Sequence, residues 1–191
     1  FKYDRRDSKN YPLKGYYFDT EYSNTKYNDI QFNNINQNIK LFIPLTNNLF
    51  YGCAITNKLI DNNNLPFILQ QGLGYKKDYV RGFEYYVING EYFFLYKNAI
   101  AYNIINVKQK KLNLFKNEKF DKIHYAAYIT TFFDMAYLKK NILPDKLSNK
   151  WLKGYGIGLD FVSYYDKVIR LEYSFNNINE SGFFINFISS L

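Results

Sequence analysis

The chain has few of the residues that build disulfides, metal centres or membrane-spanning helices. Its 191 residues include one cysteine, Cys53, and one histidine, His124. One cysteine cannot form a disulfide within the chain, and no cysteine and histidine cluster has zinc-ligand spacing. No run of about 18 consecutive apolar residues occurs, which excludes a membrane-spanning helix. Only a closed barrel could then carry this chain across a bilayer.

Proline is also scarce, whereas aromatic residues are abundant. The sequence has 4 Pro against 21 Tyr and 18 Phe, and aromatic residues make up 21% of the chain. Aromatic and β-branched side chains suit the pleated surface of a sheet, so this composition favours β-structure. The formal net charge is +8. The lysines are scattered among asparagines rather than gathered on one face, so we expect no nucleic-acid partner.

Period-two alternation is the main structural signal in the sequence. It is clearest in the segment 167–175, where Ile169, Leu171, Tyr173 and Phe175 alternate with Arg170, Glu172 and Ser174. Such alternation is typical of a strand with one apolar and one polar face. The segments 123–137, 151–165 and 182–191 repeat it. The Gly154, Gly156 and Gly158 positions would then share the polar face of their strand.

The same pattern predicts about eight main strands and places loops between them. Earlier strands are expected at 14–22, 35–45, 49–60 and 91–107, with a further short run near 67–75. Asparagine-rich and lysine-rich stretches, such as 61–64 and 108–119, are expected to be turns or loops. We therefore predict an all-β fold built from antiparallel strands.

Strand length and the position of the aromatic residues favour a transmembrane β-barrel over a soluble β-sandwich. The predicted strands run to about ten residues or more, the length that a tilted strand needs to cross the hydrocarbon layer. Sandwich strands average about five or six residues. Aromatic residues also gather near segment ends, as Tyr92, Tyr102 and Trp151 do, where the aromatic girdles of a barrel would lie. The soluble sandwich stays open as the alternative from these patterns alone.

Several short motifs, in order along the chain, resemble those of the BamA/TamA superfamily of outer-membrane proteins, also called bacterial surface antigens. Val80-Arg81-Gly82-Phe83 is similar to the signature of the family's sixth extracellular loop. Asp4-Arg5-Arg6-Asp7 with Pro12 and Gly15 resembles the turn that leads into a barrel strand. Phe132-Phe133-Asp134-Met135-Ala136 resembles the family's aromatic-aromatic-Asp-x-Gly, and the run 154–159 resembles the glycine-rich strand after it. The resemblance covers nearly the whole chain.

The resemblance implies that residues 1–191 are the C-terminal half of an outer-membrane β-barrel, with about eight of sixteen strands. Because the chain opens at Phe1 without a signal peptide, we expect a fragment, with N-terminal strands and periplasmic domains outside it. The implied location is the bacterial outer membrane. The implied function is an assembly factor that folds and inserts β-barrel proteins, with outer-membrane lipids, unfolded β-barrel clients and periplasmic or lipoprotein partners. The alternatives are a barrel of the same superfamily that transports polypeptides or lipids, and a soluble aromatic-rich binding domain.

The resemblance also assigns roles to individual residues. Arg81 would bind Asp134 inside the barrel, Gly82 would allow a tight turn, and Phe83 would pack on the lumen wall. The charged residues Asp160, Arg170 and Glu172 would face the lumen. The terminal strand would form an opening seam, to which we assign Gly182, Phe183, Phe184 and Leu191.

Three positions depart from the family pattern. Ala101 stands where a second acidic partner of the arginine often lies, and Ala136 stands where the family has glycine. The chain ends in Leu191 rather than in an aromatic residue.

Nothing in the sequence favours an enzyme. Asp160 and Glu172 could do acid-base chemistry only if they converged on a pocket about five to ten Å apart. Charged residues pointing into a barrel lumen are the ordinary case. The glycines at 154, 156 and 158 do not fit the dinucleotide-binding pattern, whose third glycine would fall where Leu159 stands. We expect no catalytic residue, cofactor or metal.

Overall fold

A computed structural model of the chain describes residues 1–27, 30–61, 69–75, 77–111, 122–141, 144–163 and 167–188. These residues form one nine-stranded antiparallel sheet in which each strand pairs with its neighbours in sequence order. The strands are β1 (Lys2–Asp4), β2 (Gly15–Tyr27), β3 (Ile30–Pro44), β4 (Leu49–Ile60), β5 (Tyr92–Lys111), β6 (Lys122–Lys139), β7 (Trp151–Ser163), β8 (Lys167–Asn176) and β9 (Ser181–Ile188). No helix in the described residues is long and apolar enough to cross a membrane.

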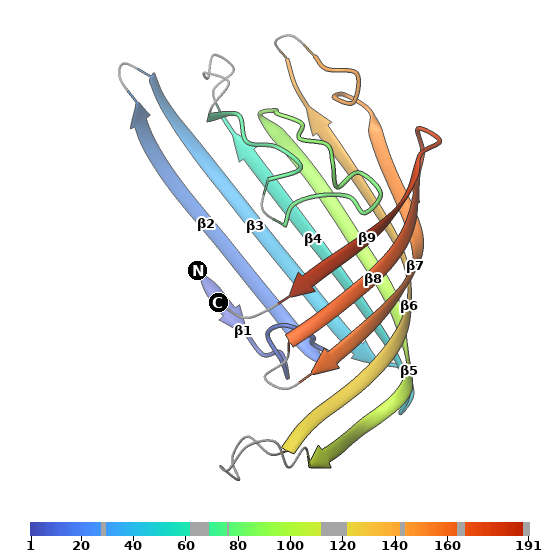
Figure 1. The fold of residues 1–191 in the computed structure, drawn as a ribbon. Helices are drawn as coiled ribbons and strands as arrows, with labels where there is room; N and C mark the ends of the chain where they lie inside the picture. Colours follow the sequence, from blue (N-terminus) through green and yellow to red (C-terminus); the bar gives the residue numbers. More distant parts are fainter. Residues whose placement is uncertain are drawn as a thin grey trace.

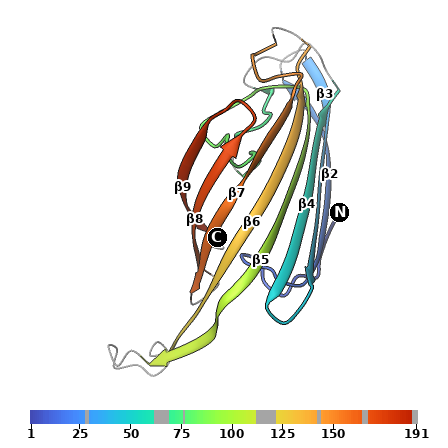
Figure 2. The same cartoon turned by 90° about the vertical axis from the view of Figure 1, so that its right-hand side faces the viewer.

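The sheet curves strongly but does not close on itself. Figures 1 and 2 show it bent into a trough, with β9 at one edge and β1 and β2 at the other. In the described part of the chain, β1 and β9 are not hydrogen-bonded to each other. The prediction of antiparallel β-structure is therefore confirmed, as an open meander sheet rather than a closed barrel. The soluble sandwich is not supported, because the strands form one sheet and not two packed layers.

Several strand boundaries differ from those predicted. The short β1, which covers only three residues of β2, was not expected, so there are nine strands rather than about eight. β3 begins at Ile30, earlier than predicted, and residues 108–111 extend β5 instead of forming a loop. The described part of the predicted run near 67–75 is not a strand but belongs to a folded connection. Phe67, residues 62–64, residues 112–119 and Leu191 lie outside the described residues.

The two faces of the sheet differ in polarity as the alternation predicts. The strand register places one row of residues across the concave face of β3 to β7: Lys40, Ala54, Lys97, Asp134 and Gly154. The neighbouring row, on the convex face, contains Leu41, Phe133, Tyr155 and Phe175. Exposed large apolar side chains continue over that face, including Ile35, Ile39, Ile43, Ile129, Ile157, Phe161, Ile169 and Ile185.

The described residues of the connection between β4 and β5 fold back against the concave face (Figure 2). Their apolar side chains Leu73, Val80, Phe83 and Ile88 are buried. They pack in one cluster with residues of β5, β6 and β7, namely Phe93, Leu95, Ala136, Leu138 and Leu152. We call residues 69–91 the inner loop. Its docking gives the sheet a buried apolar core on the concave side.

Candidate functional site: the inner loop and its ion-pair network

The centre of the site is Arg81, which the inner loop carries onto the concave face. Its Nε donates to Asp134 Oδ2 at 2.8 Å and its Nη2 donates to Asp134 Oδ1 at 2.6 Å. The backbone N–H of Arg81 also donates to Asp134, at 3.1 Å. The structure thus contains the contact that the sequence resemblance implies, in a bidentate form that fits a planar guanidinium to a carboxylate.

Other groups complete the shell around the Arg81 guanidinium. Nη1 lies 3.4 Å from Glu172 Oε1, and Nη2 donates to the Asn98 carbonyl at 3.0 Å. The guanidinium carbon lies 3.9 Å from the centre of the Phe132 ring, a distance suited to a cation–π contact. Glu172 therefore supplies the second acidic partner that Ala101 does not. The sequence placed Glu172 on the polar face but did not predict this contact.

Both side chains of the Arg81 and Asp134 ion pair are buried. The Asp134 side chain is completely buried, and that of Arg81 is 9% exposed. Burial disfavours the charge of Arg81, but the carboxylates of Asp134 and Glu172 outweigh it and raise the pKa of the guanidinium. Removing one partner of such a pair leaves an uncompensated buried charge. The pair therefore fixes the position of the inner loop strongly.

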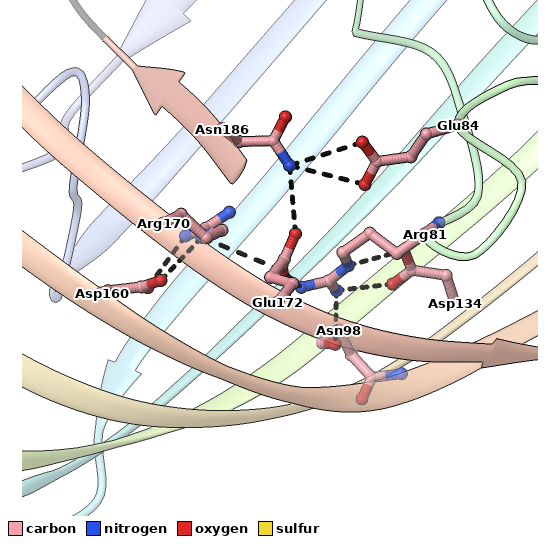
Figure 3. Close-up of polar contacts among 8 residues, drawn as sticks. All are labelled: Arg81, Glu84, Asn98, Asp134, Asp160, Arg170, Glu172 and Asn186. Carbon is pink, nitrogen blue, oxygen red and sulfur yellow. Dashed lines mark hydrogen bonds and ion pairs between the residues drawn. The ribbon is translucent and has the colours of Figure 1, made fainter. Parts of the chain in front are cut away.

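A second ion pair, which is partly buried, adjoins the first between β7 and β8 (Figure 3). Arg170 donates to both carboxylate oxygens of Asp160, from Nε at 2.8 Å and from Nη2 at 3.0 Å. Glu172 lies between the two arginines, since its Oε1 is 3.9 Å from Arg170 Nε. The three residues predicted to face the lumen thus come together on the concave face, and Glu172 links their pair to the Arg81 pair.

The inner loop also brings a carboxylate of its own, Glu84, to the network. Asn186 of β9 donates to both Glu84 oxygens at 3.4 Å and to Glu172 at 3.3 Å. Burial and then the negative charge of Glu172 raise the pKa of the Glu84 carboxyl, although Asn186, Lys97 and Arg81 act in the opposite direction. Sequence reasoning missed Glu84 and Asn186, because it could not show that β9 lies opposite the loop.

Two glycines allow the inner loop to approach the sheet closely. Gly82 has a φ of 90°, a left-handed conformation in which a side chain would be strained. A Cβ at Gly154 would lie 1.8 Å from the Arg81 carbonyl oxygen, so only glycine leaves room for the loop backbone. Asn176 then donates to the Gly82 carbonyl at 2.8 Å. Phe83 is buried in the apolar cluster on the concave face, and its place on a lumen wall stays a prediction.

The residues assigned to a terminal seam occupy β9, apart from Leu191. Gly182, Phe183 and Phe184 pair with Ser174, Tyr173 and Glu172 of β8. Phe183 is exposed, whereas Phe184 is buried on the concave face, where its ring lies 5.3 Å from that of Tyr85. Leu191 lies outside the described residues. The opening of this seam remains a prediction.

Comparison with models of known protein families, with curated protein sequences and with solved structures gave no match. Assignment of this chain therefore depends on its own residues and geometry.

The chemistry available to the site is that of a salt-bridge network. In the described residues, no group of three or more histidine, cysteine, aspartate or glutamate side chains is arranged to hold a metal ion. Asp134 and Asp160 each accept two hydrogen bonds from a guanidinium. Such carboxylates act as structural acceptors: Asp134 holds the inner loop against the sheet, whereas Asp160 links β7 to β8 through Arg170.

Proposed function

We propose that this protein is part of an outer-membrane β-barrel of the BamA/TamA type, which folds and inserts other β-barrel proteins. The observation that carries the proposal is the inner loop bound through Arg81 to Asp134 on the concave face of an antiparallel meander sheet. The same residues carry the sequence resemblance. The inner loop, its carboxylate partner and the antiparallel sheet together support the proposal.

The two faces of the sheet support a membrane location. β3, β4, β6 and β7 have 15, 12, 18 and 13 residues, more than the roughly 9 to 11 that a tilted strand needs to cross the hydrocarbon layer. The exposed isoleucines and aromatic residues of the convex face would contact lipid tails. Polar and charged groups gather on the concave face, which would line the lumen.

In the proposed mechanism, a client strand is templated at the edge of the sheet. β9 pairs with β8 from Ile188, opposite Val168, to Ser181, opposite Phe175. Its other edge has no partner strand in the described residues. Backbone N–H and C=O groups at such an edge can pair with an added strand. The free energy comes from burying the client's apolar surface in lipid, so the mechanism requires no cofactor. Outer-membrane lipids, unfolded clients and periplasmic or lipoprotein partners are the expected contacts.

A transport role is the second candidate, and the polar concave face favours it. A barrel lined in this way, with an inner loop against its wall, could pass a polypeptide or handle a lipid. Both roles use the same fold, so only a cellular measurement separates them.

The decisive experiment depletes the full-length protein in its host and quantifies the other outer-membrane β-barrels by mass spectrometry. A broad fall in their levels, rescued by the wild-type protein but not by Arg81→Ala, supports the assembly role. Steady barrel levels with one mislocalised secreted protein or lipid class would replace it with the transport role. Recovery of the protein without detergent would contradict both, because a barrel needs detergent for extraction.

A further inference from the structure

A second feature of the concave face is a cavity that the ion-pair network does not fill. It has a volume of about 320 Å³ and lies between the turn 6–13, which connects β1 to β2, and the concave face of β3 to β8. Its floor includes the small residues Gly52, Ala54, Ala99 and Ala101. Because these side chains are short, the sheet leaves space at this point. The volume is within the range of small-molecule sites.

The wall of the cavity is strongly cationic. The lining includes six basic side chains and a single carboxylate: Arg6, Lys9, Lys40, Lys77, Lys97 and Arg170, against Asp160. Arg170 already binds Asp160, and Arg6 binds Asp4 at 2.7 Å. The four lysines make no ion pair with any carboxylate in the described residues. The surplus of positive charge therefore belongs to the lysines.

Lys40 and Lys97 hold central positions in this wall. Both stand in the same row of the sheet on either side of Ala54, so their backbones lie about 10 Å apart, two strand spacings. Their ammonium groups lie over aromatic rings, Lys40 at 5.5 Å from Tyr17 and Lys97 at 4.1 Å from Tyr79. The negative charges of Asp134 and Glu172 also act on the Lys97 ammonium group, but neither carboxylate forms an ion pair with it. Both side chains are partly exposed, so their charge is available to an anion that enters the cavity.

A neutral donor points to the same kind of ligand. Thr130 is 4% exposed and lines the cavity, and its Oγ1 has no hydrogen-bond partner within the described structure. Buried hydroxyl groups are nearly always hydrogen-bonded. A ligand with several acceptor oxygens would satisfy this hydroxyl while neutralising the lysines. Phosphate oxygens combine both properties.

We propose that this cavity binds a phosphate-bearing ligand, with Lys40 and Lys97 as its charged contacts and Thr130 as a hydroxyl donor. The aromatic side chains Phe42 and Phe50, which share the concave face with Lys40 and Ala54, would accommodate an apolar portion of the same molecule. The ligand is thus either a free phosphate compound or the headgroup of a phospholipid. The site is independent of the assembly role, because it concerns the concave face and not the edge of the sheet.

The test uses the full-length chain in a non-ionic maltoside detergent and titrates it separately with pyrophosphate and with short-chain phosphatidic acid by calorimetry. Saturable binding of pyrophosphate identifies a free phosphate compound, and binding of phosphatidic acid alone identifies a lipid headgroup; either result supports the proposal. Absence of binding to both probes would overturn it.

Matched variants separate this site from general attraction to a basic protein. Lys40→Gln should lower affinity about tenfold, as expected for loss of a hydrogen bond to a charged group, whereas Lys40→Arg should retain it. Lys139→Gln removes an exposed lysine outside the cavity and should change nothing. Thr130→Val should weaken binding several-fold, and Thr131→Val, on the exposed face of the same strand, should not. An equal loss in the control variants would refute the site.

Discussion

Asp134→Asn is the most direct test of how the inner loop is held. The substitution keeps the size of the side chain but removes the negative charge that two Arg81 nitrogens contact at 2.6 and 2.8 Å. The amide can accept one of these bonds but not both, and its NH₂ group would face a guanidinium that has only donors. Arg81 would then keep only Glu172, at 3.4 Å, as a charged partner.

The magnitude follows from the burial of the pair. Breaking a buried ion pair by removing one partner costs about 3 to 5 kcal/mol. The loop can release Arg81 to water, so we take the lower value of about 3 kcal/mol for the docked state relative to the released state. At 1.36 kcal/mol per tenfold change, the released population should rise roughly 100-fold.

Hydrogen exchange of the inner-loop amides, followed by mass spectrometry on the full-length chain in detergent, measures this population. Protection of peptides that contain Arg81 and Phe83 should fall by about two orders of magnitude in Asp134→Asn. Asp145→Asn makes the same chemical change in an ion pair whose carboxylate is 52% exposed, so it should alter protection little. Unchanged exchange of the loop in Asp134→Asn would refute the idea that this pair anchors it.

Three further predictions follow from the same structure. Gly154→Ala should release the inner loop, because the new Cβ would lie 1.8 Å from the Arg81 carbonyl oxygen. Gly182→Ala should not release it, because there the new Cβ meets only the movable ring of Phe184. Loop protection in hydrogen exchange distinguishes the two variants. The pKa of Glu84 is raised in the docked loop, so the charged form of this carboxyl is disfavoured there. Loop protection, corrected for intrinsic exchange rates, should therefore increase as the pH falls from neutral towards 4.5, the ordinary pKa of glutamate. Glu84→Gln should remove this pH dependence. On the convex face, Ile157→Arg should lower the free energy of unfolding in a bilayer by about 2 to 4 kcal/mol if that face meets lipid near the midplane. Asn38→Arg, on the concave face opposite Asp19, should be tolerated. The folding yield of the full-length protein in lipid vesicles measures both effects, and equal yields would argue against a lipid-facing surface.

Local sequence patterns predicted the polarity of the C-terminal strands because alternation has a period of two along a single segment. The segment 167–175 illustrates this: Ile169 and Tyr173 are exposed on one face, and Glu172 and Ser174 are buried on the other. The resemblance also led to the Arg81 and Asp134 contact, through residues that can be read one by one. Strand ends were less predictable, since residues 108–111 continue β5 despite their charge.

The sequence by itself thus determined an antiparallel all-β chain with one apolar and one polar face, and its resemblance to a known family indicated the pair of Arg81 and Asp134. Only the tertiary structure decided which side chains from different strands share a row. Register places Lys97 opposite Asp134, and the bend of the sheet brings Asn186 to Glu84. It also brings the turn 6–13 over the cationic cavity. A slip of one residue between strands would move every such side chain to the other face, and no single segment carries the information that fixes this choice.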